Sequence, residues 1–240
     1  VWGGTGKGFG FSRDGCHAQY VVVPAAAVVA MPESLSFAQA ATCGVPFITA
    51  WDALERSQVQ AGTRLLIIGA GAVAQAAQAL SKARGANVVL ATRRAEVAQA
   101  LQAKGVSAFQ LPEAEQLPDQ ARSYFQQHAP QVIFDTTGYW LSAAVNSVDA
   151  FGRVAVIAAP VDGLVSMSAL NLYRRGGSII GVNSLLYSLE DCARMLARIG
   201  AAFAGGIAVT EDFIERPLSE AVAAYHQVNA GSSEKIVLIP

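Results

Sequence analysis

Two glycines and an alanine follow a run of apolar residues at a spacing that suits phosphate binding. Leu65–Ile68 is predicted to be a buried strand, and Gly69, Gly71 and Ala74 come directly after it. In such a turn Gly69 permits the tight bend, Gly71 lets the backbone approach a pyrophosphate, and Ala74 lets helix and strand pack closely. The free N–H groups of the following helix can then bind the phosphates. The pattern predicts a dinucleotide site; the alternative is a glycine-rich turn in another kind of α/β protein.

The next predicted strand, Asn87–Ala91, ends just before Thr92, Arg93 and Arg94. A site that prefers NAD carries Asp or Glu at this position for the ribose 2′-hydroxyl. Here no carboxylate repels a 2′-phosphate, and two guanidiniums can pair with it. Positive charge before a helix N-terminus is also disfavoured by the helix dipole, so an anion would relieve a small cost. We therefore predict NADP(H) rather than NAD(H), with a solvated surface pair of arginines as the alternative.

Strands and helices alternate around this turn. Further apolar runs predict the strands 131–135, 154–158 and 178–182, and helical spacing predicts the helices 40–54, 73–84, 95–104 and 140–150. Unbroken apolar strands are typical of a parallel sheet covered by helices on both faces. The predicted fold class is therefore α/β, with a doubly wound parallel sheet.

The two ends of the chain follow other patterns. The chain opens without methionine in what resembles the tail of a strand, continues as a glycine-rich loop over 1–16, and is predicted to form a strand over 18–23. Ser36 and Gln39 form a capping pair for the first helix. The last fifty residues predict helices 189–199 and 219–228 and a strand 235–239 that need not join the main sheet.

Composition narrows the function classes. The chain has 240 residues, 52% of them hydrophobic, and 17 basic against 18 acidic side chains. No apolar run reaches the length of a spanning helix, and there is no basic stripe for a phosphate backbone, so neither membrane nor nucleic acid is an expected partner. Three widely spaced cysteines and no signal peptide suit a soluble, cytoplasmic protein.

Several segments, taken in order, carry a family resemblance. They are Gly15–Pro24 (Gly-x-x-Ala-Gln-Tyr-x-x-Val-Pro), Phe37–Ala41 (Phe-x-x-Ala-Ala), Thr49–Leu54 (Thr-Ala-Trp-x-Ala-Leu), Phe134–Gly138, Gly152–Val154 and Lys235–Leu238. This set resembles the medium-chain dehydrogenase/reductase superfamily, in particular its zinc-free quinone-oxidoreductase-like and enoyl-reductase-like members.

The resemblance implies a domain organisation and a chemistry. A Rossmann domain over 42–184 would be flanked by parts of a GroES-like, β-rich catalytic domain at 1–41 and 185–240, whose N-terminal stretch is missing. Hydride would pass between the nicotinamide and a small-molecule substrate. The residues implied to contact the cofactor are Gly69, Gly71, Ala72, Val73, Ala74, Thr92, Arg93, Arg94, Thr49, Thr136, Thr137, Ala158, Ala159, Val182, Ser184 and Lys235. Catalytic residues are not assigned.

Some of these residues also have a purely structural explanation. Thr49 suits an ordinary helix hydroxyl that bonds back to a carbonyl, and Lys235 suits a lysine that blunts an edge strand. Cys43 lies close to the position of a zinc ligand in zinc-dependent relatives, but aligning Thr49 with the family threonine puts Val45 there instead. We therefore expect no metal.

Three functions remain open at this stage. The first is an NADPH-dependent oxidoreductase that reduces a quinone or an activated double bond. The others are a zinc-dependent alcohol dehydrogenase with ligands in a missing N-terminal segment, and a non-catalytic NADP-binding module. Because the strand 178–182 is apolar and carries no lysine or proline, we also expect a homodimer through the edge strands of the sheet.

Overall fold

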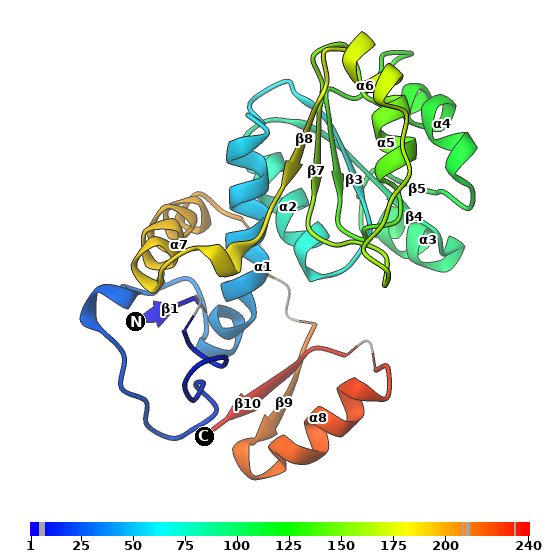
Figure 1. The fold of residues 1–240 in the computed structure, drawn as a ribbon. Helices are drawn as coiled ribbons and strands as arrows, with labels where there is room; N and C mark the ends of the chain where they lie inside the picture. Colours follow the sequence, from blue (N-terminus) through cyan, green and yellow to red (C-terminus); the bar gives the residue numbers. More distant parts are fainter. Residues whose placement is uncertain (5–7, 208, 210–211, 233) are drawn as a thin grey trace. The chain divides into compact units, whose positions relative to one another are not determined.

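The computed structural model describes residues 1–240 except 5–7, 208, 210–211 and 233, and the chain forms two compact units (Figure 1). One unit is Thr49–Asn183; the other combines Val1–Ile48 with Ser184–Pro240. Part of the glycine-rich loop expected over 1–16 lies outside the described residues. The division into 1–41, 42–184 and 185–240 stays a prediction.

The unit Thr49–Asn183 is built on a six-stranded sheet whose paired strands are all parallel. Its strands are β3 (Arg64–Ile68), β4 (Asn87–Thr92), β5 (Ala108–Gln110), β6 (Val132–Asp135), β7 (Arg153–Val156) and β8 (Ser178–Gly181). Their order across the sheet is β5-β4-β3-β6-β7-β8. The chain order reverses between β3 and β6, which is the switch point of a doubly wound sheet. The predicted fold class is confirmed.

Helices cover both faces of this sheet (Figure 1). They are α1 (Phe37–Arg56), which begins in the other unit, α2 (Ala72–Ala83), α3 (Ala95–Ala103), α4 (Leu117–Tyr124), α5 (Leu141–Ser147) and α6 (Ala169–Arg174). α2 and α3 pack on β3, β4 and β5, whereas α5 packs on β6 and β7 with α4 and α6 beside it. The helices of the β3–β5 half and those of the β6–β8 half therefore cover opposite faces of the sheet.

The apolar core explains why these strands are unbroken hydrophobic runs. On one face Leu66, Ile68 and Ile133 pack with Trp140 and Val145 of the α5 segment, all of them buried. Neighbouring residues of the same strands point to the opposite face, where Ala74, Ala77 and Leu80 of α2 are also buried. Both faces of each central strand are thus removed from water, as a parallel sheet requires.

The other unit contains two small sheets. β1 (Trp2–Gly3) pairs antiparallel with β2 (Val28–Val29), and β9 (Ile214–Pro217) pairs parallel with β10 (Ile236–Ile239). The remaining elements are α7 (Leu189–Ala204), α8 (Ala221–Asn229) and the short 3-10 turns η1 (Ala25–Ala27), η2 (Ala114–Gln116, in the sheet unit), η3 (Ser184–Leu186) and η4 (Leu218–Glu220). The C-terminal strand therefore lies outside the main sheet, as expected.

Among the described helices, α1 and α7 begin with reciprocal capping boxes, and the Ser168 hydroxyl caps α6 by accepting the Asn171 N–H at 3.1 Å. The Ser36 hydroxyl accepts the Gln39 N–H at 3.1 Å, and the Gln39 side chain accepts the Ser36 N–H at 2.9 Å. This reciprocal capping box confirms the predicted start of α1. Ser188 and Asp191 form the same arrangement at α7, and these hydrogen bonds lower the pKa of the Asp191 carboxyl.

The structure corrects several predictions. No strand forms over 18–23, where Tyr20 is 92% and Val22 is 93% exposed, because β-branched residues gain nothing from an extended strand without a partner. β7 ends at Val156 rather than at 158, and α5 ends at Ser147 because Val148 is extended. β5, α4, α6 and β9 were not predicted.

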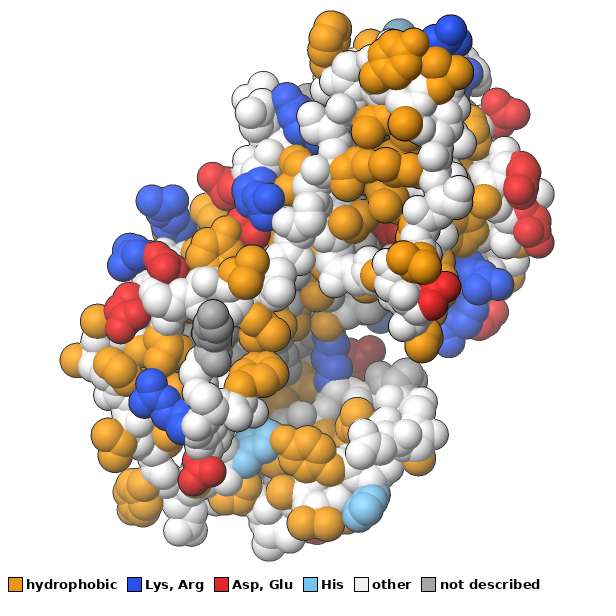
Figure 2. Space-filling view, in the orientation of Figure 1, with side chains coloured by type: hydrophobic (Ala, Val, Ile, Leu, Met, Phe, Trp, Pro, Cys, Tyr) orange, Lys and Arg blue, Asp and Glu red, His pale blue; other side chains and the backbone are white. Residues whose placement is uncertain are grey.

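Apolar side chains gather on the part of the sheet unit that carries β7, β8 and α6 (Figure 2). Leu170 and Tyr173 of α6 are exposed, as are Val161 and Leu164 in the loop between β7 and α6. Within the described residues, no helix combines the length and apolar character needed to cross a membrane.

Candidate functional site

The turn after β3 needs glycine at its first position for two reasons. Gly69 has φ +121°, a conformation that side chains disfavour. A Cβ at Gly69 would also lie 2.1 Å from Oγ1 of Thr136. Thr136 is held in place because its N–H and its hydroxyl both donate to the Ile68 carbonyl, at 3.0 and 2.8 Å. Gly69 thus lets the loop after β6 lie directly against the end of β3.

Gly71 serves a different purpose. Its φ is −73°, and a Cβ added there would meet no atom within 4 Å. Neither local conformation nor packing within the chain therefore requires glycine at 71. The open space above it is the feature expected where a ligand must approach the backbone closely.

The N-terminus of α2 supplies donors beside this space. The helix has no side-chain cap, and the N–H of Gln75 is bonded to the Gly71 carbonyl. The N–H groups of Ala72, Val73 and Ala74 precede that first helical bond and have no intrahelical partner. Ala74 is fully buried, as its predicted role in helix packing demands. This arrangement fits a pyrophosphate, although contact with one stays a prediction.

A buried carboxylate that the site prediction omitted organises the neighbouring loop. Asp135, the last residue of β6, has no exposed surface. Its Oδ1 accepts hydrogen bonds from the N–H of Thr137 at 2.8 Å, the Thr137 hydroxyl at 2.8 Å and the Gly138 N–H at 3.1 Å. Its Oδ2 accepts the Trp140 N–H at 2.8 Å, at the start of α5. One charge thereby fixes both the loop and the helix that follows it.

These bonds decide what Thr136 and Thr137 can offer to a ligand. Each hydroxyl has one hydrogen, and each donates it within the protein, to the Ile68 carbonyl and the Asp135 carboxylate respectively. Toward a ligand both hydroxyls are therefore acceptors. Ribose hydroxyls are donors, so the predicted contact along a ribose has a consistent polarity.

The loops after β6 and β7 touch at Gly138. This residue has φ +83°, and a Cβ there would lie 2.5 Å from the carbonyl carbon of Ala158 and 2.6 Å from the nitrogen of Ala159. The predicted residues 136–137 and 158–159 are thus neighbours at the carboxyl edge of the sheet. Ala158 does not end a central strand, as was predicted, but lies in the exposed loop two residues after β7.

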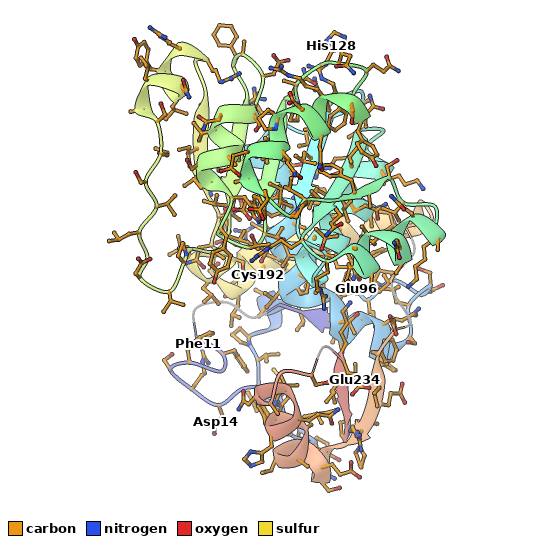
Figure 3. The ribbon with its side chains drawn as sticks, turned by 90° about the vertical axis from the view of Figure 1, so that its right-hand side faces the viewer. Phe11, Asp14, Glu96, His128, Cys192 and Glu234 are labelled. Atoms are coloured by element: carbon orange, nitrogen blue, oxygen red, sulfur yellow. The ribbon has the colours of Figure 1, made fainter. Side chains whose placement is uncertain are left out.

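The arginine pair lies at the same edge, after β4. Thr92 is the buried last residue of that strand, while Arg93 and Arg94 are exposed. Arg94 Nε is 3.8 Å from Glu96 Oε1, an exposed ion pair that contributes little (Figure 3). The Arg93 guanidinium has no partner within the described part of the chain, and α3 begins at this point without a side-chain cap. Two cations beside an open helix N-terminus favour an anionic ligand.

The remaining predicted residues are divided between the two units. Thr49 and Val182 are buried in the sheet unit, where the Val182 N–H extends the β8 ladder by bonding to Val156 O at 2.9 Å. Ser184 and Lys235 belong to the other unit, with Ser184 buried and the Lys235 carbonyl accepting the Ile214 N–H at 2.8 Å. Cofactor contact by these four residues stays a prediction.

Cys43 has the properties of a packed helix residue. It is fully buried on α1, and its thiol donates to the Gln39 carbonyl at 3.3 Å. Burial raises the pKa of this thiol to about 11, which disfavours the thiolate that binds metal. Among the described residues, no three His, Cys, Asp or Glu side chains gather into a metal site.

Comparison with known proteins decides the family. The family described as zinc-binding dehydrogenase matches residues 72–201, slightly more than half of the chain. The chain belongs to the medium-chain dehydrogenase/reductase superfamily. A zinc-type alcohol dehydrogenase-like protein of Schizosaccharomyces pombe is 30% identical over 99% of this chain and 72% of its own length.

Two further members of the superfamily extend the comparison. Human quinone oxidoreductase is 27% identical over 94% of this chain and 69% of its own length. The structure of an alcohol dehydrogenase superfamily protein from Novosphingobium aromaticivorans is 26% identical, has a TM-score of 0.78, and is covered over 66% of its length. The chain therefore spans about two thirds of these medium-chain relatives. Members of this superfamily are oxidoreductases that bind a nicotinamide cofactor, NAD or NADP.

The role of Asp135 in positioning the site can be tested by Asp135→Asn. The substitution keeps the shape but replaces one accepting oxygen with an NH₂ group that faces N–H donors. We expect the free energy of unfolding, measured by urea denaturation, to fall by about 2–3 kcal/mol. Glu113→Gln, an exposed acid-to-amide change, is the matched control and should stay within about 0.5 kcal/mol. Equal losses in the two variants would contradict the role given to Asp135.

Proposed function

We propose that this protein is an NADPH-dependent oxidoreductase that transfers hydride to a quinone or to an activated carbon–carbon double bond without a metal. The observation that carries the proposal is the pairing, at one sheet edge, of the open helix N-terminus after Gly71 with the exposed arginines after β4. The similarity to human quinone oxidoreductase supports a quinone as the hydride acceptor.

In this proposal the chain's own groups bind and orient the cofactor. The N–H groups of α2 bind its pyrophosphate, and Arg93 and Arg94 pair with the 2′-phosphate. The hydroxyls of Thr136 and Thr137 accept hydrogen bonds from ribose, and the loop at Ala158 lies toward the nicotinamide half. The nicotinamide supplies the hydride when bound. The protein's contribution is orientation and the exclusion of water.

A zinc-dependent alcohol dehydrogenase is the second candidate. It is favoured by the name of the matching family and by the S. pombe relative. In this case the ligands would come from a segment outside the present sequence, since a catalytic zinc needs three protein ligands. A non-catalytic NADP-binding module is the third candidate, and it requires only the carboxyl edge described above.

The oxidoreductase proposal is tested by following NADPH oxidation with a naphthoquinone and with cyclohex-2-enone. We expect acceptor-dependent oxidation that survives dialysis against EDTA, with no stoichiometric zinc by metal analysis. Zinc-dependent activity would establish the second candidate instead. NADPH binding without NADPH oxidation by either acceptor would favour the third candidate, the non-catalytic NADP-binding module.

Gly71→Val provides the internal control for this assay. Because a Cβ at this position meets nothing in the protein, the variant should fold normally. Its side chain enters the space proposed for the pyrophosphate, so NADPH-dependent turnover should be lost. Retained turnover in a folded Gly71→Val variant would contradict the proposed cofactor position.

The cofactor preference is tested by replacing Arg93 and Arg94 with alanine. We expect NADPH binding, measured by fluorescence titration, to weaken by about 1.5–3 kcal/mol because charge-assisted hydrogen bonds to the 2′-phosphate are lost. NADH binding should be nearly unchanged. The double variant Arg122→Ala/Arg174→Ala, which removes two exposed positive charges from α4 and α6, controls for net charge. An equal loss for NADPH and NADH would refute contact with the 2′-phosphate.

We further propose that the protein forms a homodimer through β8. The N–H groups of Ser178 and Val182 bond to β7, so Ile179 and Gly181 direct their backbone groups outward. Arg56 Nη1 already donates to the Gly181 carbonyl at 2.7 Å, which leaves the groups of Ile179 and the Gly181 N–H for a partner strand. The apolar group around α6 adjoins this edge (Figure 2).

Sedimentation velocity tests the dimer. We expect a dimer at micromolar concentration, and at least about a ten-fold weaker dimer in Ser178→Lys because a charge at an exposed position of the edge strand opposes pairing. Ala83→Lys, exposed on α2, is the matched control and should leave association unchanged. A wild-type monomer at micromolar concentration would overturn the proposal.

A further inference from the structure

A hollow lies at the amino-terminal edge of the six-stranded sheet, opposite the carboxyl edge that carries the proposed cofactor site. It has a volume of about 510 Å³ and lies among the starts of β3, β4 and β5, the end of α2 and the turn after α4. His128 marks this end of the sheet unit, while Glu96 lies at the other end, near the arginine pair (Figure 3). The volume is within the range of small-molecule sites.

Two basic side chains and a histidine line this hollow. Arg64, Lys82 and His128 line it, and no carboxylate does. Arg64 is engaged in the protein, since Nε donates to the Ala129 carbonyl at 2.8 Å and Nη2 to Asp149 at 2.6 Å. Lys82 and His128 have no side-chain partner within the described part of the chain. Their donors are therefore available to a ligand.

Amide side chains surround Lys82 and His128. Gln78 lies one helical turn before Lys82 on α2, Asn87 begins β4, and Gln126 precedes His128. Within the residues that the structure describes, none of these three side chains has a hydrogen-bond partner. Amide NH₂ groups add neutral donors to the charged ones. The set is rich in donors, and its acceptors are neutral.

The turn that presents His128 is unusual in its backbone. Gln126 has φ 54° and Gln127 has φ 70°, a left-handed conformation that non-glycine residues seldom adopt. The turn is fixed by bonds from the Gln127 N–H to the Arg122 carbonyl at 2.8 Å and from the His128 N–H to the Phe125 carbonyl at 3.0 Å. Val106 and Tyr124 supply an apolar wall beside it.

We propose that this hollow binds a small organic phosphate, at a site separate from the one proposed for the dinucleotide. Lys82, His128 and the amides would bind the phosphate oxygens, and the apolar wall would take the organic part. The inference rests on the geometry of this edge and does not depend on the proposed function.

The probe is ribose 5-phosphate, titrated into the ¹⁵N-labelled Gly71→Val variant and followed by amide chemical shifts. This variant fills the space above the glycine turn, so phosphate binding there is suppressed. We expect saturable shifts at Lys82, Asn87, Gln126 and His128. Shifts confined to residues near 69–74, or no saturable binding, would overturn the proposal.

Side-chain variants then test the named groups. Lys82→Gln should raise the dissociation constant about ten-fold, as the loss of a charge-assisted contact predicts, and His128→Gln should also raise it because an imidazole N–H donor is lost. Arg174→Gln, exposed on α6, removes the same charge elsewhere and should leave it unchanged. An equal loss in Arg174→Gln would show non-specific attraction, and tighter binding of citrate than of ribose 5-phosphate would overturn the phosphate assignment.

Discussion

The carboxylate of Asp135 holds together the edge of the sheet at which the proposed cofactor site lies. It is fully buried, and a buried charge is stable only when hydrogen bonds replace its lost hydration. Four donors from Thr137, Gly138 and Trp140 provide that replacement. Because the donors belong to one loop, satisfying the charge also dictates the course of the loop.

Two close contacts connect the loop after β6 to neighbouring segments. Thr136 lies against Gly69, and Gly138 lies against Ala158 and Ala159. The loop after β6 therefore contacts both the turn after β3 and the loop after β7. Parallel strands bring these three segments to one edge, where the lack of a Cβ at Gly69 makes room for the Thr136 side chain and the lack of one at Gly138 makes room for the backbone of 158–159. The course of the three segments at this carboxyl edge is thus tied to contacts within the protein itself.

The sequence allowed prediction of features that depend on local pattern. The strand at Leu65–Ile68, the glycine turn and the Ser36–Gln39 capping box are each encoded within a few residues, and all three are present. The arginines after β4 were predicted at the carboxyl edge by strand length alone. These features require no knowledge of distant partners.

Features that depend on distant partners escaped prediction. Residues 18–23 are rich in valine but have no neighbouring strand, whereas β5 has three residues and exists because β4 offers an edge. Asp135 gave a weak signal, a carboxylate at the end of an apolar strand and three residues before a glycine. Its importance becomes visible once the turn brings its four donors together.

The contrast between Gly69 and Gly71 bears on how variation in this chain should be read. At Gly69 a side chain would clash with Thr136 and require a disfavoured φ, so selection for folding alone would remove it. At Gly71 neither constraint operates, and a side chain there is compatible with the folded chain. Glycine retained at 69 among related sequences would therefore record the demands of architecture, whereas glycine retained at 71 would record the demands of a bound molecule.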